Sequence, residues 1–390
     1  MDLNEDEKRM TAQRTDKNRK KSPIKKKVSL TSKCICVRIG AENGKHGGFG
    51  TMKKIGKQVL FLKTGEGNPR NGEGSFVRLK DGRIMHAYTE YYGDHWEDAC
   101  TARLSACYSC DEGESWSDHE ILLEKDENAE NYMSVSLVRL ADGALGMLYL
   151  RKEKKADGTL LCMPMFRRSE DEAKTWGEPT PCLDRDGYYC AINDGAIVQK
   201  NGRLLMPMSD HCGAYDHLEA TPYDGEKRDT VIVVYSDDHG KTWGVLPHLF
   251  VSPFHVHSSL AEPGIYEREN GELWLWARTP YGHQYESRSY DGGQTWTAMM
   301  PNFYFTSPDA PMRVKKLGDY TVAVFNPKGY SCLREDYSAR GNILRVPLVC
   351  AVCKDDGATF DPTVKGVFNR GLHRFAEACY LLENDDDDRY

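Results

Sequence analysis

The chain has 390 residues, a formal net charge of −7 and a hydrophobic share of 39%. It contains no apolar run near the roughly 18–20 residues that a membrane-spanning helix needs, and no apolar segment of signal-peptide type at the N-terminus. Its thirteen cysteines are odd in number and scattered, unlike a paired secretory framework. We therefore expect a protein without a membrane span that stays in the cytoplasm, with secretion as the alternative.

The first segment of the chain is basic. Residues 1–27 carry ten Lys or Arg against five acids. A segment so poor in apolar residues cannot offset its own ordering entropy, so residues 1–33 are predicted to be a disordered tail and residues 34–390 a single domain. A basic run can also serve nuclear import or nucleic-acid binding. Because the rest of the chain is acidic, we expect no nucleic-acid partner.

Four hairpin signals follow in chain order. Each places Asp-Gly or Asn-Gly between two apolar runs, and they stand at residues 79–88, 140–149, 199–208 and 268–277. These dipeptides favour a two-residue type I′ turn, which needs positive φ at both positions. Each signal therefore predicts two antiparallel strands.

An eight-residue motif recurs after the hairpins. Its copies are SCDEGESW (109–116), SEDEAKTW (169–176), SDDHGKTW (236–243), SYDGGQTW (289–296) and the weaker CKDDGATF (353–360). A period of about 60 residues indicates a repeat architecture, and four antiparallel strands per unit match one propeller blade. We expect each motif aspartate to accept hydrogen bonds from its own turn, and each Trp to pack between neighbouring sheets. These aspartates are therefore interpreted as structural rather than catalytic.

Five motifs and a leading strand at residues 57–63 predict an all-β fold, a six-bladed β-propeller built from four-stranded antiparallel blades. The sixth blade would start at residues 376–383 and be closed by an N-terminal strand. Only seven residues follow Glu383, so either this blade is incomplete or residues 28–63 fill more of it.

The motif is the Asp-box, or bacterial neuraminidase repeat. Together with AEPGIYERENGELWLWAR (261–278), it resembles the sialidase superfamily, specifically the bacterial exo-sialidases, over roughly residues 60–383. The resemblance implies a monomeric glycoside hydrolase that releases terminal sialic acid from sialylated or other acidic glycans, without a metal or organic cofactor. Asp-boxes also occur in propellers that are not sialidases, so they are more specific for the fold than for the activity.

The resemblance assigns three arginines to the sugar carboxylate. Arg278 stands where the family has its second arginine, and Arg345 precedes the fifth motif where the third is expected. Arg70, in NPRNGEG, is the candidate for the first, although the family's Arg-Ile-Pro signature is absent. A planar guanidinium suits this task because it pairs both carboxylate oxygens and stays charged.

The catalytic residues are assigned in the same way. Glu262, in AEPG, stands where the family has the glutamate that activates its tyrosine nucleophile. Asp98 lies in the loop that carries the general acid, and Asp94 is the runner-up. The CxxC pairs at residues 107–110 and 350–353 lie on strands four blades apart, so no metal site is expected.

The nucleophile departs from the family pattern. The family places its tyrosine at the start of the last blade, here within HRFAEACY (373–380), where Phe375 stands near the expected position and cannot attack. Tyr380 is the candidate nucleophile, with Tyr330 or Glu377 as alternatives. Two other functions stay open, namely a propeller hydrolase or lyase for another glycan and a catalytically inactive glycan-binding propeller.

Overall fold

The described part of the chain is built of β-strands, with one short 3-10 segment. The computed structural model describes residues 35–38, 54–55, 57–211, 229–251, 260–327, 345, 348–360 and 378–382. Of residues 35–38, 54–55, 57, 359 and 378–382 only the backbone is described. All of these belong to one unit that spans Ser32–Tyr390.

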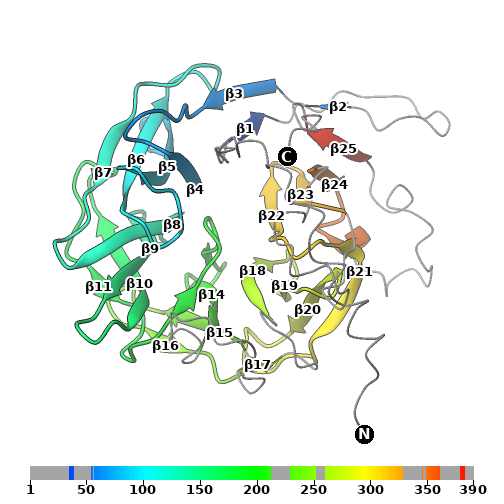
Figure 1. Ribbon diagram of the computed structural model, residues 1–390. Helices are drawn as coiled ribbons and strands as arrows, with labels where there is room; N and C mark the ends of the chain where they lie inside the picture. The colour runs from blue at the N-terminus through cyan, green and yellow to red at the C-terminus, as the bar shows by residue number, and fades with distance from the viewer. Residues whose placement is uncertain are drawn as a thin grey trace, which may run out of the picture. The chain divides into compact units, whose positions relative to one another are not determined.

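The strands follow one another as antiparallel groups in chain order (Figure 1). The first group is β4 (Arg70–Arg78), β5 (Ile84–Tyr91), β6 (Ala102–Ser109) and β7 (Glu120–Leu123). The second is β8 (Ala129–Arg139), β9 (Leu145–Lys154), β10 (Leu160–Ser169) and β11 (Thr180–Pro181). A single parallel pair between Ala102 and Asn131 joins these two groups.

Three further groups complete the series. The third is β12 (Tyr189–Cys190), β13 (Ile197–Val198), β14 (Leu204–Asp210), β15 (Thr230–Ser236), β16 (Gly244–Val245) and β17 (Phe250–Val251). The fourth is β18 (Ala261–Glu267), β19 (Leu273–Arg278), β20 (His283–Ser289) and β21 (Met300–Thr306). The fifth is β22 (Arg313–Leu317), β23 (Tyr320–Phe325), β24 (Val349–Cys353) and β25 (Ala378–Leu382), with the 3-10 segment η3 (Ala358–Phe360) after β24.

The core lies between consecutive groups, because their middle strands are apolar on both faces. Alternate side chains of a strand point to opposite sides. On β14, Leu204 and Met206 pack toward the second group, whereas Leu205 packs toward the fourth. On β19, Trp274 and Trp276 pack toward the fifth group and are fully buried. Four such apolar layers join the five groups in sequence.

The four predicted hairpins are present, but the predicted turn type is wrong. In the first, the Leu79 N–H donates to the Arg83 carbonyl at 2.8 Å, which leaves three loop residues instead of two. Only the glycine, Gly82, has positive φ. The preceding Asp81 carboxylate accepts a hydrogen bond from the Arg83 N–H at 3.0 Å, which stabilises a type I turn followed by a left-handed glycine. The other three hairpins repeat this pattern.

The predicted role of the motif aspartate is confirmed in the first four copies. Asp111 accepts hydrogen bonds from the Ser109 hydroxyl at 2.8 Å and from the Ser115 backbone N–H at 2.9 Å. The bonds from Ser115 lower the pKa of Asp111 to about 2. Asp171, Asp238 and Asp291 repeat the geometry. At neutral pH these carboxylates are ionised and fully engaged in their own turns.

In the third, fourth and fifth copies the motif aromatic packs against the preceding group, as predicted. The Trp243 ring lies 5.4 Å from Phe166 of β10, and the Trp296 ring lies 5.1 Å from Phe250 of β17. In the weaker fifth copy Phe360 takes the place of Trp and lies 5.5 Å from Tyr304 of β21. The motif thus closes a turn and links two groups of strands.

The prediction that residues 376–383 start a sixth blade is wrong. Strand β25 pairs antiparallel with β24 and is therefore the fourth strand of the fifth group. Beyond the five groups, the described strands are β1 (Ile35–Arg38), β2 (Lys54–Ile55) and β3 (Lys57–Phe61). Strand β1 pairs with β3, and β2 pairs parallel with β25. The leading strand at residues 57–63 is thus present, as β3.

Left-handed backbone recurs near the start of each group of strands. The five non-glycine residues with positive φ outside the Asp-box turns are Glu73, Ser134, Asp194, Glu262 and Asp309, in the described ranges. Three of them lie at β-bulges, in β4, β8 and β18. A bulge re-aims a side chain, and left-handed φ on a residue with a side chain marks local strain. Four of the five are acidic, and three of these acids contact arginines that were predicted from the sequence as site residues.

Candidate functional site

Arg70 begins β4 and is held by two carboxylates. Its guanidinium lies 2.5 Å from Glu73 Oε1 and 2.5 Å from Asp98 Oδ1. It also lies over the ring of Tyr91, 4.6 Å from the centroid. Burial opposes the charge of Arg70, but Glu73 and Asp98 raise its pKa above the ordinary value. The bulge in β4 and the loop at residues 92–101 therefore converge on one guanidinium.

Arg278 ends β19 and forms the matching cluster in the fourth group. It forms an ion pair with Glu262, and its Nε donates to Asp309 Oδ1 at 2.7 Å. Ala261 lies opposite Arg278 in the β18–β19 ladder, so the hairpin brings the glutamate beside the arginine. The positive φ of Glu262 falls within the register shift between Ala261 and Gly264.

Arg345 meets the same cluster through Asp309. Its Nη2 donates to the Asp309 carbonyl at 3.1 Å. Within the described ranges it forms no ion pair with a carboxylate, and the residue is exposed. Loss of hydration and the like charge of Arg278 lower the pKa of Arg345. The guanidiniums of Arg278, at the end of β19, and of Arg345, which precedes β24 in the chain, thus share one supporting residue.

The two clusters influence each other electrostatically. The positive charge of Arg278 helps to lower the pKa of Asp98. The negative charge of Asp98 in turn opposes the lowering of the pKa of Arg345. The negative charge of Glu262 contributes to the raised pKa of Glu73. The structure therefore brings Arg70, Arg278 and Arg345 into one region with Asp98 and Glu262.

The two carboxylates on Arg70 have opposite protonation behaviour. Burial raises the pKa of Glu73 to about 7, although Arg70 opposes the rise. Partial loss of hydration would also raise the pKa of Asp98, but the charge and hydrogen bond of Arg70, with the charges of Lys152 and Arg278, lower it below the ordinary value. Carboxylates whose environments push their pKa values apart are suited to different roles in proton transfer.

The loop that carries Asp98 is fixed by buried side chains of the second group. Asn131 Nδ2 donates to the carbonyls of Asp98 and Cys100, each at 2.8 Å. Lys152 Nζ donates to the same Asp98 carbonyl at 2.8 Å. The side chain of Asp98 stays 66% exposed and so is accessible to a ligand.

The other predicted site residues lie elsewhere or are only partly described. Asp94 is exposed, and within the described residues its side chain makes no hydrogen bond or ion pair. The backbone of Tyr380 lies on β25 opposite Cys350, on a fourth strand and not at the start of a blade, and its side chain is outside the described atoms. Phe375, Tyr330 and Glu377 lie outside the described residues.

Sequence reasoning missed two supporting carboxylates, Glu73 and Asp309. Both have positive φ and each contacts a predicted arginine. Glu73 stands between two glycines in NGEG, and Asp309 stands in SPDAP. An acid next to glycine or proline near the start of a group of strands is the local signal for such a left-handed residue.

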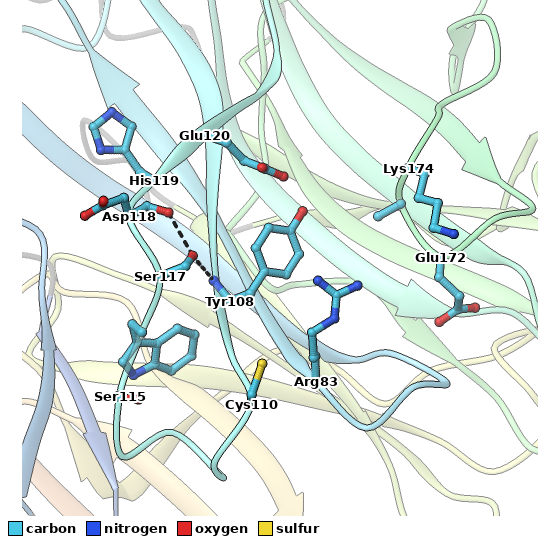
Figure 2. A pocket seen from close by; sticks show the side chains of 12 residues that line it. Arg83, Tyr108, Cys110, Ser115, Ser117, Asp118, His119, Glu120, Glu172 and Lys174 are labelled. Atoms are coloured by element: carbon cyan, nitrogen blue, oxygen red, sulfur yellow. Dashed lines mark hydrogen bonds between the residues drawn. The ribbon is translucent and has the colours of Figure 1, made fainter.

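One pocket in the described part of the chain lies away from these residues. It measures about 790 Å³ and is lined by the first and second Asp-box turns, with Cys110, Glu172 and Lys174, and by Arg83 and Tyr108 of the first group of strands (Figure 2). It shares no residue with the arginine cluster. Because its walls are the structural turns described above, we assign the candidate site to the arginines.

No group of three or more His, Cys, Asp or Glu side chains in the described residues is arranged to hold a metal ion. No helix in the same residues has the length and apolar character needed to cross a bilayer.

Comparison with known proteins gives a family and a fold. A family model described as a BNR repeat-like domain matches residues 111–365. A protein of unknown function from Dyadobacter fermentans is similar in structure with a TM-score of 0.57 and 19% identity, over 77% of this chain and 83% of that one. An intramolecular trans-sialidase from Ruminococcus gnavus has a TM-score of 0.53 and 13% identity, over 79% and 86%.

A Hadza microbial sialidase also matches, with a TM-score of 0.57 and 14% identity over 75% of this chain. The match spans 57% of that sialidase, so the sialidase chain is considerably longer. Identities this low establish the fold alone. The chain belongs to the BNR repeat-like domain family and has a sialidase-like β-propeller fold.

Proposed function

We propose that this protein is a glycoside hydrolase of the exo-sialidase type, which releases a terminal sialic acid from a glycan. The observation that carries the proposal is the meeting of Arg278 and Arg345 on Asp309, with Arg345 lacking a carboxylate partner in the described ranges. A six-bladed closure of the propeller is part of the proposal, because it would place the first strands of all groups around one pocket.

Arg345 is the guanidinium best prepared for a ligand carboxylate. Its like-charged neighbour Arg278 disfavours its charged form, and an incoming anion would relieve that repulsion. Arg278 is already compensated by Glu262 and Asp309, so it would orient the ligand while Arg345 supplies the uncompensated charge. A sugar that carries a carboxylate on its anomeric carbon meets this requirement.

Asp98 is proposed to protonate the leaving oxygen. In the free protein the charge of Arg70 favours its ionised form. When a substrate carboxylate approaches the arginines, its negative charge raises the pKa of Asp98 and favours the protonated acid that the step needs. Glu73, on the other side of Arg70, would hold that guanidinium in place.

Glu262 is proposed to take the proton from the attacking hydroxyl, and Tyr380 is retained as the proposed nucleophile. The tyrosine oxygen would bond to the anomeric carbon as the leaving oxygen receives the proton of Asp98, and water would then release the sugar. The support for Glu262 is its place beside Arg278 and its left-handed backbone. The assignment of Tyr380 rests on the sequence resemblance.

A second function is favoured by the charge balance of the site. Arg70 and Arg278 are each already paired with two carboxylates. Because the positive charge of these arginines is already neutralised, the site can also accept a less acidic sugar. This would suit a propeller hydrolase or lyase that acts on another glycan. In an inactive glycan-binding propeller, binding would occur without turnover.

The proposal is tested with a panel of fluorogenic sialosides, uronic glycosides and neutral glycosides. We expect turnover of the sialosides alone. Glu262→Gln should lower kcat by at least about a hundredfold and leave binding largely intact, as removal of a general base does. Glu267→Gln, on the same strand and next to the hairpin, is the matched control and should keep full activity.

Three outcomes would redirect the proposal. Turnover of uronic or neutral glycosides only would favour the second function. Binding without turnover of any glycoside would favour an inactive sugar-binding protein. Full activity of Tyr380→Phe would exclude Tyr380 as the nucleophile while leaving the arginine site in place.

A further inference from the structure

A second positive cluster lies on β22, apart from the arginine site. Arg313 and Lys315 are two residues apart on this strand and therefore point to the same face. Both reach the same residue of the third group. Lys315 Nζ lies 2.9 Å from Asp194 Oδ1, and Arg313 donates to the Asp194 carbonyl. One residue thus serves two cations, Lys315 through its carboxylate and Arg313 through its backbone carbonyl.

Asp194 is also held by two other groups of strands. Its backbone N–H donates to the Val135 carbonyl at 2.9 Å, and Ser75 Oγ donates to its Oδ1 at 2.8 Å. The preceding Asn193 donates to the Gly74 carbonyl at 2.8 Å. Asp194 itself has positive φ. The first and second groups therefore fix this carboxylate opposite β22, as a built feature and not as a chance surface contact.

The cluster has more positive charge and more donors than its described partners satisfy. Arg313 Nε and Nη1 are buried and have no hydrogen-bond partner among the described residues. Loss of hydration lowers the pKa of both Arg313 and Lys315, and Asp194 compensates only part of this. Buried donors and unpaired buried charge are costly, so such a place favours an anion that accepts from them.

We propose that Arg313 and Lys315 bind a small inorganic anion, chloride or phosphate, beside Asp194. The anion would accept from Arg313 Nε or Nη1 and compensate the positive charge that Asp194 leaves unbalanced. The site is independent of the proposed glycosidase activity. Within the described ranges, no hydrogen bond or ion pair joins it to Arg70, Arg278 or Arg345.

The test is thermal unfolding and titration calorimetry of the full chain with inorganic phosphate and, separately, with sodium chloride. We expect a saturable rise of Tm with one of the two salts, at concentrations where the other gives only a gradual ionic-strength effect. The salt that saturates identifies the anion. Lys315→Met should weaken binding by at least about tenfold, the effect of losing one charge-assisted hydrogen bond.

Lys316→Met is the matched control, since Lys316 is the exposed neighbour on β22 and pairs with Glu269 instead. It should keep the saturable response. Arg313→Lys retains the charge with fewer donors and covers the case in which Lys315→Met fails to fold. The proposal is overturned if wild type responds to both salts without saturation, or if Lys315→Met and Arg313→Lys both saturate like wild type.

Discussion

At the scale of single residues, the pairing of Arg278 with Glu262 is the contact that sequence spacing could anticipate. The two stand sixteen residues apart around one hairpin, and antiparallel pairing sets Ala261 opposite Arg278. Asp309 could not be anticipated in this way. It reaches Arg278 from the next group of strands, through a left-handed residue whose direction depends on tertiary packing.

Glu73 gives a prediction about stability and pH. Its pKa is raised from 4.5 to about 7 in the folded protein, so folding favours the protonated form. This contribution is complete below about pH 4.5 and is lost as the pH rises to about 7. Glutamine mimics the protonated acid, so Glu73→Gln should gain on the order of 1–3 kcal/mol relative to wild type between pH 4.5 and 8.

Urea denaturation of both proteins at the two pH values measures this difference. Glu127→Gln, a substitution of an exposed glutamate, serves as the control and should track wild type at both. If the difference in unfolding free energy between Glu73→Gln and wild type is the same at both pH values, the raised pKa is contradicted.

At the scale of elements, the Asp-box turns were predictable because the motif makes all of its hydrogen bonds within eight residues. The hairpins were predictable in place but not in type. The Asp or Asn before each glycine bonds the backbone two residues on, and that bond selects a three-residue loop. The partner of β25 was not predictable, since antiparallel strands on either side would both accept an apolar strand.

Substitutions at two glycines distinguish the cost of backbone strain from the cost of disturbed packing. Both Gly240 and Gly271 have positive φ, but a methyl group at Gly240 would lie 2.0 Å from the Phe166 ring, whereas Gly271 has open space. Gly271→Ala should cost about 1 kcal/mol from the backbone alone. Gly240→Ala should cost roughly 1–3 kcal/mol more, because the ring of the preceding group must move.

Chemical denaturation of the two variants gives the comparison. Equal losses of unfolding free energy would mean that the Asp-box turn does not pack tightly on the preceding group. The result thus tests the layer that joins the second and third groups.

At the scale of the whole molecule, the repeat period was enough to predict antiparallel groups in series, because each group can bury its two faces only against its neighbours. It was not enough to assign the last strands. Strand β25 belongs to the fifth group, and the described strands outside the five groups are β1, β2 and β3. The repeats also say nothing about chemistry, since their aspartates are engaged in turns.

The chemistry depends on residues that the repeats carry to a common region. Arg70, Arg278 and Arg345 come from the first, fourth and fifth units, and the charges around them act on one another. The central claim is that this region binds a sugar through its carboxylate.

The most direct measurement is calorimetric titration of the wild type and Arg345→Met with a sialic acid analogue and with its methyl ester. Wild type should bind the acid at least about tenfold more tightly than the ester, and Arg345→Met should lose most of that preference. Equal affinity of wild type for acid and ester, or an unchanged preference in Arg345→Met, would contradict the account.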